Sequence, residues 1–194
     1  MIDLPQLVAR FQDHLDFAIR EGIFEPAAFS LATVGPDGRP SVRIVLLKAA
    51  DERGFVFYTN TRSRKGREIT ASGRAAMVFW WGPIHRQVRI EGPVTPVSAA
   101  EADAYFASRN RGSQIGAWAS NQSSVLPDRE ALLAAAKDVE ARYAAGPVPR
   151  PPHWSGYRVA PELMEFWYGR EDRLHERMQY TLEGNGWVER ILAP

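Results

Sequence analysis

Residues 170–178, REDRLHERM, place Arg173, His175 and Arg177 at every second position, with Arg170 just upstream. On a β-strand, alternate side chains point to the same face, so three cations or near-cations would be crowded together there. Because neighbouring like charges cost stability, this spacing favours a bound anion on that face. The two flanking arginines disfavour a charged imidazole, so we expect His175 to be neutral until an anion binds.

A second basic motif is SRKGRE at 63–68, which predicts a short helix capped by Ser63. Arg64 and Lys65 then lie in its first turn, where cations oppose the helix dipole. The free backbone N–H groups of the same turn bind anions, so a bound phosphate would make this placement favourable. The alternative is a solvated basic patch.

Two further groups of side chains have the chemistry of anion ligands. Arg43 and Lys48 stand at the two ends of the apolar strand RIVLLK, where they either reach anionic groups or protect a sheet edge. Tyr105 and Arg109 lie one helical turn apart, and Ser113 follows; hydroxyl and guanidinium groups are phosphate donors, although an ordinary helix surface would look the same.

The elements that must position these residues are read from apolar periodicity and turn signals. We expect helices at 4–21 (within an N-terminal helical segment, 1–22), 63–71, 99–108 and 128–145, the third opened by a Ser98–Glu101 capping box. We expect strands at 29–34, 41–48, 55–60, 75–81, 86–97, 157–168, 173–181 and 186–192. Residues 111–124 show no period and are expected to form a loop that carries ligand contacts. The order predicts one mainly β domain over 1–194, an antiparallel barrel with peripheral helices.

Composition excludes several classes of function. The 194 residues carry a net charge of +1, which gives no global attraction to nucleic acid or an anionic membrane. Cysteine is absent, which excludes disulfides and thiolate chemistry, and the four histidines are not closely paired, so we expect no metal centre. The N-terminus has no sustained apolar run, so we expect a cytoplasmic protein without a signal peptide or a membrane span. The remaining inventory suits a phosphorylated aromatic cofactor and a second small anion, with Trp167 able to pack against a flat ring.

Eight segments occur in an order that resembles the pyridoxamine 5′-phosphate oxidase family: RIVLLK, FVFYTN, SRKGRE, RQVRIEG, SRNRGSQIGAWASNQSS, PPHWSGYR, EFWYGREDRLHER and RILAP. The resemblance runs from about residue 25 to the C-terminus. It implies a split β-barrel that binds FMN in a cleft between the two subunits of a homodimer. Members of the family usually carry a basic and aromatic stretch before the first helix, which can cover the active site; this chain starts almost at that helix.

The resemblance also implies roles for individual residues. FMN would be held by Arg43, Ile44, Val45, Leu46, Lys48, Tyr58, Thr59, Arg64, Lys65, Gln87, Gln122, Ser123, Trp167 and Arg177. The substrate phosphate would be bound by Lys48, Tyr105, Arg109 and Ser113. Arg173 and His175 would be the catalytic residues, lying over the substrate's pyridine ring opposite the flavin.

The implied reaction is oxidation at the C4′ carbon of a phosphorylated pyridine, with hydride transfer to flavin N5. Pyridoxine 5′-phosphate gives pyridoxal 5′-phosphate directly, and pyridoxamine 5′-phosphate gives an imine that water hydrolyses to release ammonia. Dioxygen reoxidises the flavin and forms hydrogen peroxide. Two alternatives stay open: a related flavin oxidase of the phenazine-biosynthesis branch, and a non-catalytic module that binds FMN or pyridoxal phosphate.

Overall fold

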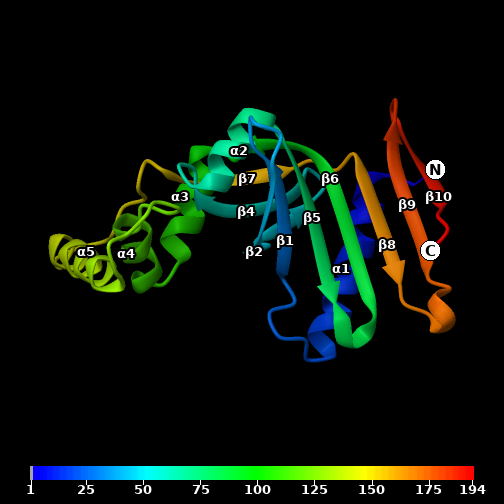
Figure 1. Cartoon of the computed structure of the whole chain (residues 1–194), viewed down its shortest axis with the longest axis horizontal. Helices are drawn as coiled ribbons and strands as arrows, with labels where there is room; N and C mark the ends of the chain where they lie inside the picture. Colours follow the sequence, from blue (N-terminus) through cyan, green and yellow to red (C-terminus); the bar gives the residue numbers. More distant parts are fainter. Residues whose placement is uncertain (1) are drawn as a thin grey trace.

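The computed structural model describes residues 2–194, and its main feature is an antiparallel sheet curled into a half-barrel (Figure 1). The strands are β1 (Ala28–Val34), β2 (Pro40–Leu46), β3 (Ala49–Asp51), β4 (Gly54–Asn60), β5 (Arg74–Trp81), β6 (Arg86–Pro96), β7 (Trp154–Val159), β8 (Leu163–Tyr168), β9 (Glu176–Glu183) and β10 (Gly186–Ile191). The helices are α1 (Leu4–Arg20), α2 (Arg64–Ser72), α3 (Ala99–Ser108), α4 (Arg111–Ala119) and α5 (Arg129–Arg142), with 3₁₀ turns η1 (Gly82–Ile84) and η2 (Glu171–Arg173). Within the described residues, no helix is long and apolar enough to cross a membrane.

The long strand β6 joins the two parts of the barrel. The main path runs β10-β9-β8-β6-β5-β1-β2, while the end of β6 pairs with β7, which in turn pairs with β4. At this corner, a Cβ atom on Gly92 would lie 1.9 Å from the carbonyl oxygen of Ala160, so only glycine allows the backbones to approach so closely. All of the observed pairings are antiparallel, which confirms the expected class of fold.

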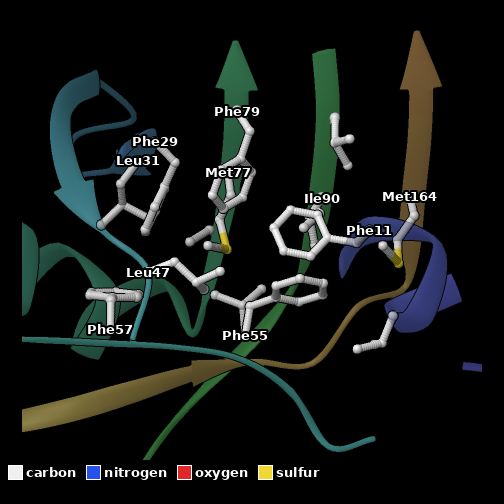
Figure 2. Packing of buried hydrophobic residues seen from close by; sticks show 14 of the residues in the cluster. Phe11, Phe29, Leu31, Leu47, Phe55, Phe57, Met77, Phe79, Ile90 and Met164 are labelled. Carbon is white, nitrogen blue, oxygen red and sulfur yellow. The ribbon is translucent and has the colours of Figure 1, made fainter. Parts of the chain in front are cut away.

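The core lies between the curled sheet and α1. Phe11 of α1 packs against Phe55 and Phe79, with ring centroids 4.9 and 4.8 Å apart (Figure 2). Met77 and Ile90 are fully buried beside these rings. Because full burial of one such side chain is worth roughly 1.5–3 kcal/mol, this cluster fixes the position of α1 under the sheet. Strand alternation buries one face of β5 and leaves Ala76, Val78 and Trp80 on the other.

The caps of two predicted helices form as expected. The hydroxyl of Ser63 accepts a hydrogen bond from the Gly66 N–H at the start of α2. Ser98 and Glu101 form a reciprocal capping box at the start of α3. The helices α3, α4 and α5 lie together at one end of the molecule, beside β4 and β7 and far from β9 and β10 (Figure 1).

The expected loop at 111–124 is wrong, because residues 111–119 form helix α4. Asn110 caps this helix by accepting a hydrogen bond from the Ser113 N–H, and Ile115 is buried on its inner face. Gly112 and Gly116, both poor helix formers, hide the apolar period in the sequence.

The expected strands at 41–48, 157–168 and 173–181 also need correction. Lys48 lies beyond the end of β2, and 157–168 contains parts of two strands, β7 and β8, separated around Pro161. Arg173 and His175 precede β9, so of the three alternating residues only Arg177 lies on a strand. The reason is local: Asp172 and Arg173 have φ values of 53° and 61°, which a strand does not allow.

Candidate functional site

The main cavity of the molecule has a volume of about 650 Å³ and lies between β2, β4, α2, α3 and α4. This volume suits a cofactor or a small-molecule ligand. The residues that line it are Ile44, Val45, Leu46, Lys48, Tyr58, Thr59, Asn60, Lys65, Tyr105, Arg109, Asn110, Ser113, Gly116, Ala117, Ser120, Gln122 and Trp154. Three of them are cations and none is a carboxylate, so the cavity is suited to anions.

On one side, the first turn of α2 presents donors to the cavity. The ammonium group of Lys65 donates to Gln122 Oε1 at 2.8 Å and to Thr59 Oγ1 at 3.2 Å. Burial and, next, the charge of Arg43 lower the pKa of Lys65, because both disfavour the ammonium form. The Ser123 hydroxyl accepts from the Arg64 N–H at 3.1 Å, so the segment that carries Gln122 lies against the first turn of α2.

On another side, three aromatic rings form a stacked wall. Tyr58 lies 4.0 Å from Tyr105, centroid to centroid, and the plane of Trp154 is within 10° of both. Strand β7 makes this possible at Gly156, where a Cβ atom would lie 2.7 Å from the Tyr58 ring. The guanidinium carbon of Arg109 lies 4.8 Å from the Trp154 ring centroid, at the end of this wall.

Arg109 is the least satisfied polar group of this wall. Its Nη1 atom is buried and has no hydrogen-bond partner within residues 2–194. Burial lowers the pKa of Arg109, and the nearby Tyr105 only partly opposes that shift. A buried cationic N–H without an acceptor costs free energy. An anionic ligand bound beside Arg109 would supply the acceptor that Nη1 lacks among the described residues.

Two of the predicted FMN residues, Arg43 and Arg64, do not line the cavity but hold a buried carboxylate. Glu68 of α2 is only 5% exposed, and its two oxygens lie 2.8 Å from Arg64 Nε and 3.3 Å from Arg43 Nη2. Burial raises the pKa of Glu68, but hydrogen bonds from Ser41, Thr33 and Arg64 outweigh that effect and hold the pKa at about 2. The carboxylate therefore ties α2 to β1 and β2.

A second group of predicted residues lies on β6, β8 and β9. Gln87 and Arg177 are the register neighbours of Trp167, and the His175 ring lies 4.6 Å from the Trp167 ring. Arg177 makes two hydrogen bonds to Glu165, at 2.8 and 3.2 Å, which raise its pKa. His175 Nδ1 accepts from the Arg170 N–H at 3.1 Å, so a neutral ring carries its proton on Nε2.

Within a single chain, this second group lies away from the cavity. Gln87, Trp167, Arg173, His175 and Arg177 are absent from its lining. Strand β8 is separated from β2 by β6, β5 and β1, which is roughly 19 Å along a sheet. Arg173 itself is exposed.

The sequence reasoning missed six residues of the lining: Asn60, Asn110, Gly116, Ala117, Ser120 and Trp154. Gly116, Ala117 and Ser120 lie in the segment 111–124, which was expected to be a ligand-contacting loop without these residues being singled out, and Asn110 immediately precedes it. Asn60 and Trp154 lay in segments that were singled out, FVFYTN and PPHWSGYR, but neither residue has a spacing that distinguishes it from a core residue.

Two family models match the chain over most of its length. Residues 15–143 match the family model described as pyridoxamine 5′-phosphate oxidase, and residues 154–194 match the model described as the pyridoxine 5′-phosphate oxidase C-terminal dimerisation region. The chain belongs to the pyridoxamine 5′-phosphate oxidase family.

Curated relatives in this family resemble the chain over nearly its whole length. It is 54% identical to the pyridoxine/pyridoxamine 5′-phosphate oxidase of Rubrobacter xylanophilus over 190 residues, which cover 98% of this chain and 88% of the relative. It is 58% identical to that of Gluconobacter oxydans over 170 residues, which cover 88% of this chain and 85% of the relative.

Solved structures of the same fold are also similar. PhzG from Burkholderia lata, solved in complex with tetrahydrophenazine-1-carboxylic acid, shares 38% identity with a TM-score of 0.92 and covers 96% of this chain, with 92% of its own length aligned. An FMN-binding protein from Nostoc punctiforme shares 18% identity with a TM-score of 0.73, covering 94% of this chain and 95% of its own, which shows a common fold alone.

Proposed function

We propose that this chain oxidises pyridoxine 5′-phosphate and pyridoxamine 5′-phosphate to pyridoxal 5′-phosphate. Dioxygen is the final electron acceptor, hydrogen peroxide is formed, and the amine substrate releases ammonia. The observation that carries this function is the buried Nη1 of Arg109, which has no hydrogen-bond partner in the described part of the chain and lies in a cavity whose lining holds three cations and no carboxylate. The phosphate of either substrate supplies the missing acceptor.

The donor set of the cavity fits FMN. Lys65, Thr59 and Gln122 lie beside the N-terminus of α2, which suits the FMN phosphate, and the backbone of Ile44–Leu46 borders the same space. Bound FMN would supply the acceptor for the hydride that leaves the substrate's C4′ carbon. Arg43 and Arg64 would act from the edge of the site, held by Glu68.

The substrate phosphate would be held at the other end of the cavity. Lys48, Tyr105, Arg109 and Ser113 all line it and together offer ammonium, hydroxyl and guanidinium donors. Positioning is then the main catalytic effect of the chain: a phosphate fixed at this end holds the C4′ carbon at a constant place relative to the flavin.

A homodimer would complete the site. Residues 154–194, which match the dimerisation region, include Trp167, Arg173, His175 and Arg177. The group of one chain does not reach the cavity of the same chain. In a two-fold symmetric dimer, the partner subunit could bring its copy of the group to that cavity. Arg173 would then stabilise charge on the pyridine ring, and the Nε2 proton of His175 would orient the substrate.

The test is turnover by purified, FMN-loaded protein. We expect oxygen-dependent formation of pyridoxal 5′-phosphate and peroxide from both substrates, and bleaching of the flavin absorbance when substrate is added without oxygen. Bleaching by a dihydrophenazine-type substrate alone would instead assign the chain to the phenazine branch. If none of these substrates bleaches the flavin absorbance, the remaining candidate function is a non-catalytic binding module.

The similarity to PhzG makes the phenazine branch the specific competitor. Lys48, Tyr105, Arg109 and Ser113 favour the phosphorylated pyridine, because all four line the cavity and offer phosphate donors. A dianionic phosphate uses more of these donors than a ring carboxylate does.

A further inference from the structure

The positive charge of Arg109 is stabilised in a different way from the charges of the other arginines of the site. Arg43 is paired with Glu68, and Arg177 is paired with Glu165. Arg109 forms no ion pair among the described residues. Its guanidinium carbon instead lies 4.8 Å from the Trp154 ring centroid and 5.7 Å from that of Phe106.

This difference matters for ligand binding. A carboxylate would neutralise Arg109 but would also occupy its N–H donors, and an incoming phosphate would have to displace it. The face of an indole ring stabilises a cation through its quadrupole and uses none of those donors. Nη1 therefore stays buried, charged and available.

Trp154 is held firmly in this position. The side chain is 5% exposed, its ring is edge-on to Phe106 at 5.0 Å, and it lies nearly parallel to Tyr58 and Tyr105. Its backbone N–H donates to the Pro151 carbonyl at 3.0 Å. The ring contacts both Arg109 and Tyr105, the two substrate-phosphate residues contributed by the end of α3.

We propose that Trp154 is a positioning residue that sets the specificity for a phosphorylated substrate, because its ring replaces the counter-ion of Arg109 and leaves the guanidinium donors free. This role rests on the proposed function. It predicts that changes at Trp154 weaken binding of the phosphate group, while the binding of the pyridine ring and of FMN is retained.

The test compares two ligands that differ only in the phosphate. FMN-saturated protein is titrated calorimetrically with pyridoxal 5′-phosphate and with pyridoxal. In Trp154→Leu, which removes the aromatic face, we expect the affinity for pyridoxal 5′-phosphate to fall about tenfold and the affinity for pyridoxal to stay constant. Trp154→Phe keeps a weaker aromatic face and should show a smaller, equally selective loss.

A matched control is Trp118→Leu, because Trp118 packs in the same apolar cluster as Trp154 but contacts no cation. It should leave the ratio of the two affinities unchanged. Equal losses for both ligands in Trp154→Phe, or an unchanged ratio in Trp154→Leu, would overturn the proposal. Wild-type protein that prefers pyridoxal 5′-phosphate over pyridoxal but shows no turnover would contradict the proposed function alone, since the titration needs no catalysis.

Discussion

At the scale of single residues, the cations of the site fall into two groups with different surroundings. Lys65 lies in the cavity and is hydrogen-bonded to Thr59 and Gln122, whereas Arg173 is exposed at η2 and is not part of the lining of this cavity. This division predicts that FMN binding and turnover respond to different substitutions.

We expect Lys65→Ala to weaken FMN binding by about 10- to 100-fold, because the proposed charge-assisted hydrogen bond to the FMN phosphate would be lost. Arg173→Ala should retain FMN and lower kcat by about 100-fold, since the substitution would remove the charge stabilisation that we propose near the reacting ring. Quenching of FMN fluorescence measures the first effect and steady-state kinetics measures the second. Equal effects of the two substitutions on both quantities would show that the division is wrong.

At the scale of elements, one buried carboxylate, Glu68, joins α2 to β1 and β2 through Thr33, Ser41 and Arg43. The pKa of Glu68 falls from its ordinary 4.5 to about 2 in the folded chain, so the folded state is favoured by the ionised form. A depressed carboxyl pKa contributes stability that is fully present above the ordinary pKa and is lost as the pH falls through the folded value.

We therefore expect the free energy of unfolding to fall between about pH 4.5 and pH 2 more steeply in the wild type than in Glu68→Gln. At neutral pH, Glu68→Gln should be the less stable protein, because Arg43 and Arg64 lose a charged partner. Urea unfolding at a series of pH values measures both effects. Glu162→Gln, which removes an exposed ion pair with Arg74, is the control, and a wild-type pH slope equal to that of Glu68→Gln would contradict the assignment.

The elements also show what could be predicted from the sequence. Helix α2 and helix α3 were predictable because their caps, Ser63 and the Ser98–Glu101 pair, are local signals. Helix α4 was not predicted, although Asn110 is also a local cap, because Gly112 and Gly116 are poor helix formers and obscure its apolar period. The turn at η2 was missed for a related reason: the positive φ values of Asp172 and Arg173 are not encoded by glycine.

Some residues of the candidate site were predictable from the sequence and others were not. Motif residues such as Lys65, Tyr105 and Arg109 line one cavity, whereas their roles toward ligands stay predictions. Trp154 was not recognised, because its role depends on a stack with Tyr58 and Tyr105, which come from other elements.

At the scale of the whole molecule, the outer face of the sheet carries apolar side chains. Trp80 is 54% exposed, Val42 and Ile44 are exposed on β2, and the Trp80 ring lies edge-on to Trp167 at 5.7 Å. Exposed large apolar side chains of this kind suit a contact between subunits.

We expect the protein to sediment with twice the mass of one chain, and Trp80→Glu to shift it toward the monomer and to lower FMN retention. The physical reason is that a charge buried in an apolar interface has no partner. Leu133→Glu, on the exposed side of α5, should change neither quantity. Analytical ultracentrifugation of both variants decides the matter, and a Trp80→Glu dimer with full FMN content would count against this face.

The separation of the cavity from the group around Trp167 has a genetic consequence. In the proposed dimer, each site takes its cavity from one subunit and the group around Trp167 from the other. Lys65→Ala alters the cavity and Arg173→Ala alters the group, so the two substitutions affect contributions from different subunits to a given site. Co-expression of the two impaired chains would then assemble hybrid pairs in which one of the two sites receives only intact residues, while the other receives both substitutions. Activity of the mixture above that of either variant alone would be the signature of sites shared between subunits.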